Sequence, residues 1–571
     1  MIEIVKSQAS MTTRDGIRLD ADIYRPNSTE DLPVLLMRQP YGRAIASTVV
    51  YAHPRWYASQ GYMVVIQDVR GRGTSTGKFD LFTHEVADGY DSVTWAAQLP
   101  YSTGKVGMYG FSYQGMTQLY AAVGRPSALC AIAPAMSAYD LYTDWAYENG
   151  AFCLYANLAW AIQLAGETAR LQGDEAVYLE LYRASRNLPL NDAIPANPEL
   201  MRRLAPDSFY HQWLHNSDPE AEYWQQRSPK YLLNDVDLPM LHVGGWFDPY
   251  LRGTFNLYQT MSAKSQYPQH LVVGPWAHLP WGRRLGAIDY GNEAQNPIDD
   301  MQIRWFDHFL KGQDTGILTE SPISLFEMGS NQWRESDRLE GSQQVYYLAS
   351  DGLASIREDS GSLWQYEPEI SDLSLSSSGE LLETDFVSNI SPLDNCVDTI
   401  VHDPWRPVPA LGGHATYPGG SWERSSLDCR SDVLTYTSPS LATDLHLAGE
   451  ITLQIYCSAE QPSFDLGAVL SILQPDGKVF NFSQGYIRVS DRTPEIQPIY
   501  LTLQPTCICI AAGHSLRLSL SAASFPAYPV NPGTNQLPHE THLIDLEIIT
   551  ISVYSGENYP SSIQLQSFSL E

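Results

Sequence analysis

Residues 107–116, GMYGFSYQGM, constrain the fold of this chain more than any other stretch. A short apolar run ends there in Ser112, glycines stand at positions 110 and 115, and a helix-like segment follows at residues 116–123. The pattern is typical of a nucleophile elbow, a tight strand-to-helix turn that holds a serine in a strained conformation with its hydroxyl pointing away from the sheet. The Gly-x-Ser-x-x-Gly spacing is one residue longer than the common motif, so a purely structural turn is the alternative interpretation.

Strand and helix patterns alternate on both sides of this elbow. A hairpin is expected over residues 11–24, because Asp15-Gly16 favours the primed turns that join two strands. Further strands are expected at residues 33–37, 62–66, 131–133, 239–244 and 270–274, with a helix at residues 88–98 whose apolar positions share one face. Alternating strands and helices predict an α/β fold, with a largely parallel sheet covered on both sides.

Two other regions have different patterns. Helix-forming segments dominate between the strands near residues 131 and 239, with helices expected at residues 145–166, 176–186 and 198–204. Beyond residue 340, short alternating segments such as 451–456, 516–520 and 543–553 indicate an all-β sandwich or jelly roll, with a surface loop at residues 371–383. The predicted domains are an α/β domain (1–137 and 238–340), a helical cap (138–237) and a β domain (341–571).

Composition narrows the classes of partner. A chain of 571 residues is too long for one core. Its formal net charge of −30 repels phosphate backbones and anionic lipid, which argues against nucleic-acid and membrane partners. No apolar window is long enough to span a bilayer, and the first residues do not resemble a secretory signal. The seven cysteines are scattered, and Cys507 and Cys509, one residue apart, make a poor metal or redox pair, so we expect reduced thiols in a cytoplasmic protein.

Two residues further along the chain can complete the chemistry of Ser112. A serine hydroxyl needs a base, and the base needs an orienting carboxylate, in the chain order Ser, Asp, His for this kind of sheet. Asp248 and His278 each follow the end of an apolar strand, where ligands collect in open α/β sheets. The alternatives are a helix N-cap for Asp248 and an ordinary loop histidine for His278.

Short motifs spread along the chain carry a resemblance to a known family. The chain resembles the cocaine esterase and α-amino acid ester hydrolase family, which is related to the Xaa-Pro dipeptidyl peptidases. The matching stretches are RDGIRL at 14–19, QPYGR at 39–43, DVRGRG at 68–73, the elbow with Ser112-Tyr113, GWFD at 245–248, GPWAH at 274–278 and GGH at 412–414. The resemblance implies an α/β-hydrolase fold with a helical cap and a C-terminal jelly roll.

The resemblance also implies roles for individual residues. Ser112 is the implied nucleophile, His278 the base and Asp248 its partner. The backbone N–H of Tyr113 and the phenol of Tyr41 are the implied oxyanion hole, although Tyr41 alone is typical of a packed loop aromatic. This chemistry needs no metal and no organic cofactor.

Candidate substrate contacts are aromatic and acidic. Trp145 and Trp160 of the cap resemble residues that hold an aryl acyl group, and Tyr250 stands beside Asp248; core packing is the alternative for all three. Relatives that act on α-amino esters bind the ammonium with several carboxylates. Here only Asp144 is a candidate for such a cluster and residues 249–251 contain no acid, so we expect uncharged acyl groups.

The sequence therefore predicts a serine hydrolase of small-molecule esters or amides that works through an acyl-enzyme on Ser112. The alternatives are an α-amino ester hydrolase or β-lactam acylase, an acyltransferase, an Xaa-Pro dipeptidyl peptidase, and an inert hydrolase fold whose jelly roll binds carbohydrate. The HQWLH segment at 211–215 has the histidine spacing of a zinc protease but Gln212 in place of the required glutamate, which indicates a cap helix. Self-association into a homo-oligomer is left open.

Overall fold

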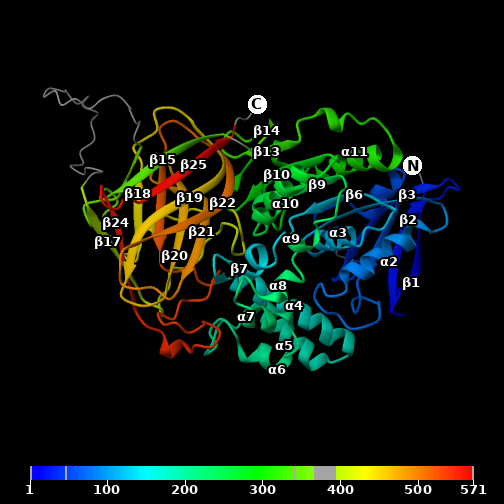
Figure 1. The fold of residues 1–571 in the computed structure, drawn as a ribbon, viewed down its shortest axis with the longest axis horizontal. Coiled ribbons are helices and arrows are strands. Elements are labelled where there is room, and N and C mark those ends of the chain that lie inside the picture. Colours follow the sequence, from blue (N-terminus) through cyan, green and yellow to red (C-terminus); the bar gives the residue numbers. More distant parts are fainter. Residues whose placement is uncertain (1–2, 45–47, 340, 366–393, 569–571) are drawn as a thin grey trace.

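The computed structural model describes residues 3–44, 48–339, 341–365 and 394–568. Two large sheets lie side by side, with a group of helices below the junction between them in the view of Figure 1. Among the described residues, no helix combines the length and apolarity needed to cross a bilayer. The cytoplasmic location and any self-association stay predictions from the sequence.

The first sheet has ten strands in the order β1-β2-β4-β3-β5-β6-β9-β10-β13-β14. From β4 to β13 every neighbouring pair is parallel, and antiparallel strands extend both edges. The strands are β1 (Ile4–Thr12), β2 (Arg18–Pro26), β3 (Leu32–Gln39), β4 (Met63–Asp68), β5 (Ser102–Phe111), β6 (Leu129–Ala135), β9 (Met240–Phe247), β10 (Gln269–Ala277), β13 (Ile323–Glu327) and β14 (Gln332–Ser336). The predicted hairpin is confirmed, since β1 and β2 pair antiparallel across Asp15-Gly16.

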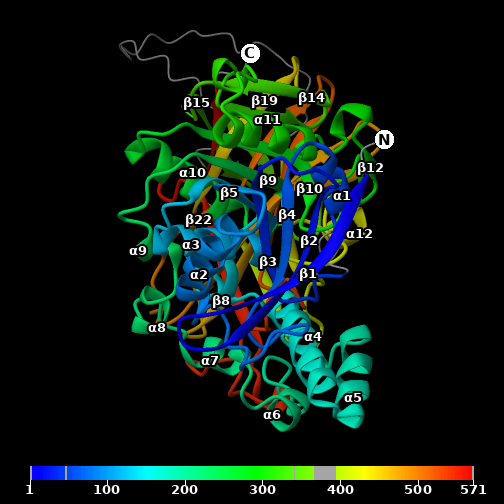
Figure 2. The same cartoon turned by 90° about the vertical axis from the view of Figure 1, so that its right-hand side faces the viewer.

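Helices cover both faces of this sheet, as Figure 2 shows from its edge. On β3, Val34 and Leu36 pack in one apolar cluster with residues of α2 and α3, while Leu35 and Met37 pack in another with residues of α1 and α11. This alternation is expected for a strand buried on both sides. The helices of this domain are α1 (Pro54–Ser59), α2 (Glu85–Ala97), α3 (Tyr113–Gly124), α10 (Leu251–Lys264) and α11 (Ile298–Lys311). The α/β class is confirmed.

A mostly helical insertion separates β6 from β9. Its helices are α4 (Leu154–Gln172), α5 (Glu175–Arg186), α6 (Glu199–Leu204), α7 (Phe209–His215), α8 (Glu222–Gln225) and α9 (Pro229–Leu232). The prediction of one helix over residues 145–166 is wrong at its start. Trp145 lies in a π-helical turn, Tyr142–Ala146, and a small hairpin of β7 (Tyr147–Glu148) and β8 (Ala151–Phe152) precedes α4. Asn149 and Gly150 both have positive φ, at 42° and 82°, which is the geometry that an Asn-Gly turn favours.

The second sheet forms an all-β domain. Its strands are β15 (Gly341–Ala349), β16 (Ser362–Gln365), β17 (Cys396–His402), β18 (Val433–Thr437), β19 (Leu445–Ala459), β20 (Phe464–Leu473), β21 (Val479–Val489), β22 (Gln497–Ile510), β23 (Ser515–Ser521), β24 (Ile549–Ser555) and β25 (Ser562–Phe568), with one short helix, α12 (Ser425–Asp428). The strand predicted over residues 543–553 begins only at Ile549, because Leu543–Asp545 form a 3-10 turn. The jelly-roll topology stays a prediction, and the loop predicted at residues 371–383 lies outside the described residues.

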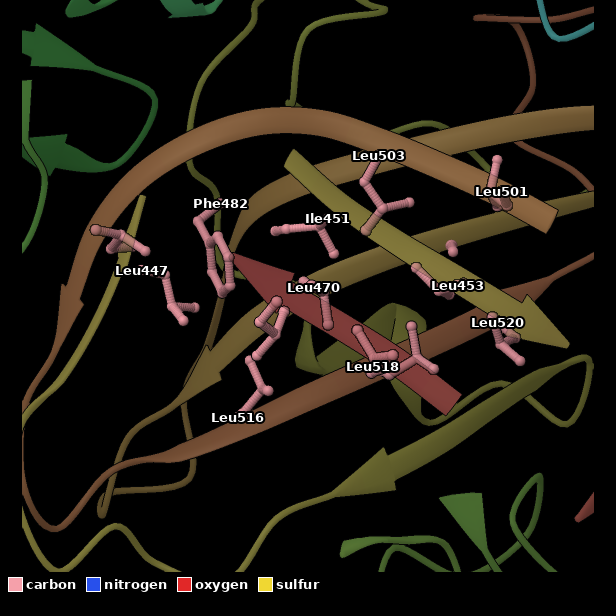
Figure 3. Packing of buried hydrophobic residues seen from close by; sticks show 14 of the residues in the cluster. Leu447, Ile451, Leu453, Leu470, Phe482, Leu501, Leu503, Leu516, Leu518 and Leu520 are labelled. Atoms are coloured by element: carbon pink, nitrogen blue, oxygen red, sulfur yellow. The ribbon is translucent and has the colours of Figure 1, made fainter. Parts of the chain in front are cut away.

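The β domain packs directly on the α/β domain. Its core is a leucine-rich cluster drawn from facing strands, as Figure 3 shows for Leu453, Leu470 and Leu518. The same cluster continues through Trp246 and Phe326 of the first sheet. This continuous apolar contact brings loops of the β domain to the ends of β9 and β10, where the candidate site lies.

Candidate active site

Ser112 occupies the turn between β5 and α3. Its backbone has φ 59° and ψ −126°, a conformation that costs a non-glycine residue on the order of 1–3 kcal/mol. The surrounding structure holds it there, because its N–H donates a hydrogen bond of 2.9 Å to the carbonyl of Ala135 on β6. This is the geometry expected of a nucleophile elbow.

The two glycines of the motif are required for different reasons. Gly110 has φ 139°, and a Cβ there would lie 2.5 Å from Cβ of Gln114. Gly115 lets α3 approach β6, since its Cβ would lie 2.9 Å from the carbonyl oxygen of Ala135. Gln114, where the common motif has glycine, closes the turn by accepting a hydrogen bond of 3.3 Å from the N–H of Phe111. The longer spacing is therefore compatible with the elbow.

Asp248 and His278 meet at one edge of the sheet. They follow β9 and β10, which are parallel neighbours, so both side chains start from the same end of the sheet. Nδ1 of His278 lies 2.7 Å from Oδ1 of the buried Asp248. A carboxylate only accepts hydrogen bonds, so Nδ1 carries the proton and Nε2 is free to act as a base.

Further contacts fix the Asp248 carboxylate and its loop. The N–H of Tyr250 donates to Oδ2 over 3.1 Å. Gln504, on β22 of the β domain, donates from Nε2 to the backbone carbonyl of Asp248 over 2.6 Å. Burial raises the pKa of the Asp248 carboxyl, and the hydrogen bond with His278 opposes that rise. The β domain thus helps to position a residue of the candidate site.

Ser112 and His278 line the same pocket, whose volume is about 480 Å³. The rings of Phe111 and Tyr250 flank the imidazole, with centroids 5.3 Å and 5.0 Å from it. Most of the described lining residues are apolar or aromatic, and none is an aspartate or glutamate. They are Tyr41, Val49, Phe111, Ser112, Gln114, Trp145, Tyr155, Ala156, Trp160, Gln163, Phe247, Pro249, Tyr250, Ala277, His278, Leu279, His414, Ala415, Thr416, Tyr417 and Gly419.

One candidate oxyanion donor lies at the start of a helix and the other in a loop. Tyr113 is the first residue of α3, and N–H groups of a first helical turn have no acceptor within their own helix. Its side chain points into the core, where the hydroxyl donates to Oε1 of Glu85 over 2.8 Å. The Tyr41 side chain lines the pocket, and its hydroxyl accepts a hydrogen bond of 3.2 Å from Nε1 of Trp160.

The Tyr41 phenol keeps its proton at neutral pH. Burial raises its pKa to about 12, although hydrogen bonds with Trp160 and Ser112 and the charge of Arg72 act in the opposite direction. A protonated phenol can donate a hydrogen bond to a developing oxyanion.

The three aromatic residues predicted to contact substrate form one wall of the pocket. Trp145 stacks on Trp160 with ring centroids 5.1 Å apart, and its ring centroid lies 4.5 Å from that of Tyr250. All three line the pocket. They are therefore both packed against one another and available to a ligand.

Asp144, the fourth predicted contact, is not among the residues that line the pocket. Its Oδ2 accepts hydrogen bonds from the N–H groups of Tyr139 and Asp140, at 3.0 Å and 2.6 Å. Burial raises its pKa to about 6. The carboxylate thus binds the backbone of its own loop, and the structure does not bring it to Ser112.

One cluster beside the pocket was not predicted as a unit. His414 of the β domain lines the pocket, and its Nε2 lies 2.9 Å from Oε2 of Glu148, which also pairs with Arg252 and accepts a hydrogen bond from Tyr528. Although burial acts to raise it, the charges of Arg252 and His414 hold the pKa of Glu148 well below its ordinary value. The only sequence signal for this cluster was the Gly412-Gly413-His414 motif. In the structure its two glycines have φ of 61° and 67°.

Comparison with known proteins identifies relatives of this chain. Residues 15–280 match the model of X-Pro dipeptidyl-peptidase (S15 family), and residues 315–564 match that of the X-Pro dipeptidyl-peptidase C-terminal non-catalytic domain. Cocaine esterase from Rhodococcus sp. (strain MB1 Bresler) is 27% identical over 98% of both chains. The resemblance to cocaine esterase and to the X-Pro dipeptidyl peptidases that the motifs predict is thus confirmed over both large domains.

Solved structures share the fold of this chain over its full length. An aminopeptidase from the marine sediment archaeon Thaumarchaeota archaeon has a TM-score of 0.80 at 21% identity, covering 100% of this chain and 97% of that one. An α-amino acid ester hydrolase has a TM-score of 0.75 at 21% identity, covering 99% and 97%. The fold class predicted from the sequence is therefore confirmed.

Proposed function

We propose that this chain is a serine esterase in which Ser112, His278 and Asp248 form the catalytic triad. The observation that carries the proposal is the 2.7 Å contact between His278 and Asp248 at the pocket that Ser112 also lines. The strained backbone of Ser112 and the esterase names of the family support the same chemistry.

The proposed triad accounts for each proton transfer of an acyl-enzyme mechanism. Nε2 of His278 takes the proton of Ser112 as its oxygen attacks the ester carbonyl, and Asp248 stabilises the imidazolium that forms. The oxyanion of the tetrahedral intermediate accepts hydrogen bonds from the Tyr41 hydroxyl and the Tyr113 N–H. The imidazolium returns its proton to the leaving alcohol, and water then attacks the acyl-enzyme by the same sequence of steps.

The pocket favours an uncharged, aromatic acyl group. Trp145, Trp160 and Tyr250 offer flat apolar faces, and a ring stacks well on such surfaces. No described residue that lines the pocket could neutralise a substrate ammonium, and Asp144 is held by backbone amides. Burying an unpaired ammonium is costly, so we infer a preference for esters with an aromatic acyl group over α-amino esters.

The assignment of Ser112 is tested by replacing it. Ser112→Ala should lower kcat for an aryl ester by about 10⁶-fold. The exposed Ser185→Ala on α5 is the control and should leave kcat unchanged. A fluorophosphonate probe should add to the parent and to Ser185→Ala but not to Ser112→Ala. Full activity of Ser112→Ala would refute the nucleophile, and an unlabelled, inactive parent would support the inert carbohydrate-binding alternative.

The acyl preference is tested with matched substrates. A phenyl-substituted acyl ester should give a higher kcat/KM than its α-amino analogue with the same leaving group. The reverse order, or faster cleavage of a β-lactam or an Xaa-Pro amide, would place the chain with the acylase or peptidase members of the family. Added alcohol or amine acceptors would reveal acyl transfer as a second product.

A further inference from the structure

Three side chains of types that can bind metals gather on the β domain, outside the pocket that Ser112 lines. One ligand atom each of Asp444, His446 and Cys509 can be chosen so that all three lie within 4.8 Å of one another. His446 on β19 and Cys509 on β22 are direct partners in the antiparallel ladder. Asp444 precedes His446 by two residues, and side chains two apart share one face of an extended chain.

The spacing of these atoms suits a small ion. Nε2 of His446 lies 3.9 Å from Sγ of Cys509. A tetrahedral zinc ion, bound at about 2.3 Å from sulfur and about 2.1 Å from nitrogen, places those two ligand atoms about 3.6 Å apart. The two side chains therefore need to close by only a few tenths of an ångström. A carboxylate oxygen of Asp444 supplies a third ligand.

A buried carboxylate already orients the imidazole. Oε1 of Glu327 lies 2.6 Å from Nδ1 of His446, which leaves Nε2 facing Cys509. Glu327 is 1% exposed and is held by the guanidinium of Arg334 over 3.0 Å. Histidine ligands of metals commonly have their second nitrogen bound to a carboxylate in this way, because it fixes the tautomer and raises the basicity of the ligand nitrogen.

The cluster also lies where the two domains join. Glu327 ends β13 of the first sheet, whereas His446 and Cys509 belong to the second. Next to it, the N–H of Cys509 donates to the carbonyl of Met328 over 2.8 Å. An ion bound to the two β-domain strands would therefore be coupled, through Glu327, to the α/β domain.

We propose that Asp444, His446 and Cys509 form a zinc site with a fourth position open to water, and that it fastens the β domain to the α/β domain. A thiolate and an imidazole favour zinc over calcium or magnesium, which bind oxygen ligands. Binding forms a zinc–sulfur bond and releases the thiol proton to solvent. In this proposal Cys509 binds the metal together with His446 on the neighbouring strand. Cys507, two residues away, is buried in the apolar core and is not a ligand.

The test measures zinc on the untagged full chain after chelator treatment under reducing conditions. Equilibrium dialysis followed by elemental analysis should find one Zn²⁺ per chain, and Co²⁺ should give the absorption of a cobalt–thiolate complex. Cys509→Ser and His446→Ala should each abolish the cobalt–thiolate band and the bound zinc. Exposed residues of the same types provide the controls, Cys429→Ser and His542→Ala, which should bind zinc as the parent does.

A second variant separates the orienting carboxylate from the ligands. Glu327→Gln should weaken zinc binding by about 10- to 100-fold while retaining the thiolate band at saturating Co²⁺. Zinc should raise the thermal unfolding temperature of the parent but not that of Cys509→Ser, whose esterase activity should stay unchanged. Absence of stoichiometric zinc in the folded parent would overturn the proposal, as would zinc binding that survives in both ligand variants.

Discussion

Tyr41→Phe tests the proposed oxyanion hole by removing one oxygen atom and leaving the ring in the pocket wall. Loss of a single oxyanion donor costs about 2.7–4 kcal/mol of transition-state stabilisation in other hydrolases, which corresponds to about 10²–10³ in kcat. The phenol should contribute in this range, because it keeps its proton and lines the same pocket as Ser112. KM should change little, because the interaction strengthens only as the oxyanion forms.

The structure also predicts a separate cost in stability. Removal of the hydroxyl leaves Nε1 of Trp160 without the acceptor that it has at 3.2 Å. An orphaned donor that is fully buried costs about 1–3 kcal/mol in the free energy of unfolding, and because this pair is partly buried we expect a loss near the lower end. Thermal unfolding therefore has to be measured beside kinetics, at a temperature where the variant is fully folded.

Trp160→Phe is the matched control for this experiment. It removes the N–H that orients the phenol but keeps both the hydroxyl and an aromatic wall. Its kcat should fall less than that of Tyr41→Phe, and the double variant should lose less than the sum of the two effects, because both act on one hydrogen-bonded unit. The assay is steady-state hydrolysis of an aryl ester. A Tyr41→Phe kcat within threefold of the parent, or a rise in KM alone, would refute the assigned role.

Three further substitutions test the positioning of the site. Asp248→Asn should lower kcat by about 10⁴-fold in the same ester assay, because an amide favours the wrong tautomer of His278; a loss below tenfold would contradict this. The pKa of Asp144 is raised to about 6, so its contribution to the free energy of unfolding is complete below about pH 4 and is lost as pH rises through about 6. The free energy of unfolding of the parent, measured with denaturant, minus that of Asp144→Asn should therefore fall by about 3 kcal/mol from about pH 4 to about pH 8. A difference that does not change with pH would contradict the raised pKa of Asp144. Gly115→Ala, whose Cβ would lie 2.9 Å from a backbone carbonyl, should lower the free energy of unfolding by about 1–3 kcal/mol. Gly166→Ala on α4, with its nearest contact at 3.7 Å, should not, and equal effects of the two would count against a tight elbow.

The sequence predicted the parts of the site that local pattern controls. Ser112 stands in a turn that glycines mark, and Asp248 and His278 follow apolar strands, so their placement at one sheet edge could be expected from strand order alone. The hairpin at Asn149-Gly150 carried an equally local signal, which the surrounding helix-forming residues obscured.

Contacts between distant segments were beyond sequence reasoning. No pattern along the chain shows that Gln504 binds the carbonyl of Asp248, or that Glu148 of the insertion meets His414 of the β domain. Asp144 shows a second limit of sequence reasoning. Its residue type suggested a substrate contact, but its carboxylate accepts a hydrogen bond from a backbone N–H of its own loop. Side-chain direction depends on packing, and packing is set by all three regions together.

A crystal structure of the chain treated with an aryl phosphonate ester tests the central claim most directly. We predict that Oγ of Ser112 displaces the ester oxygen group and bonds to phosphorus, with a phosphonyl oxygen within hydrogen-bond distance of both the Tyr41 hydroxyl and the Tyr113 N–H and the aryl group, bonded to phosphorus through carbon, beside Trp145. Attachment of the phosphonate to any other residue, or an oxygen that contacts neither donor, would contradict the account.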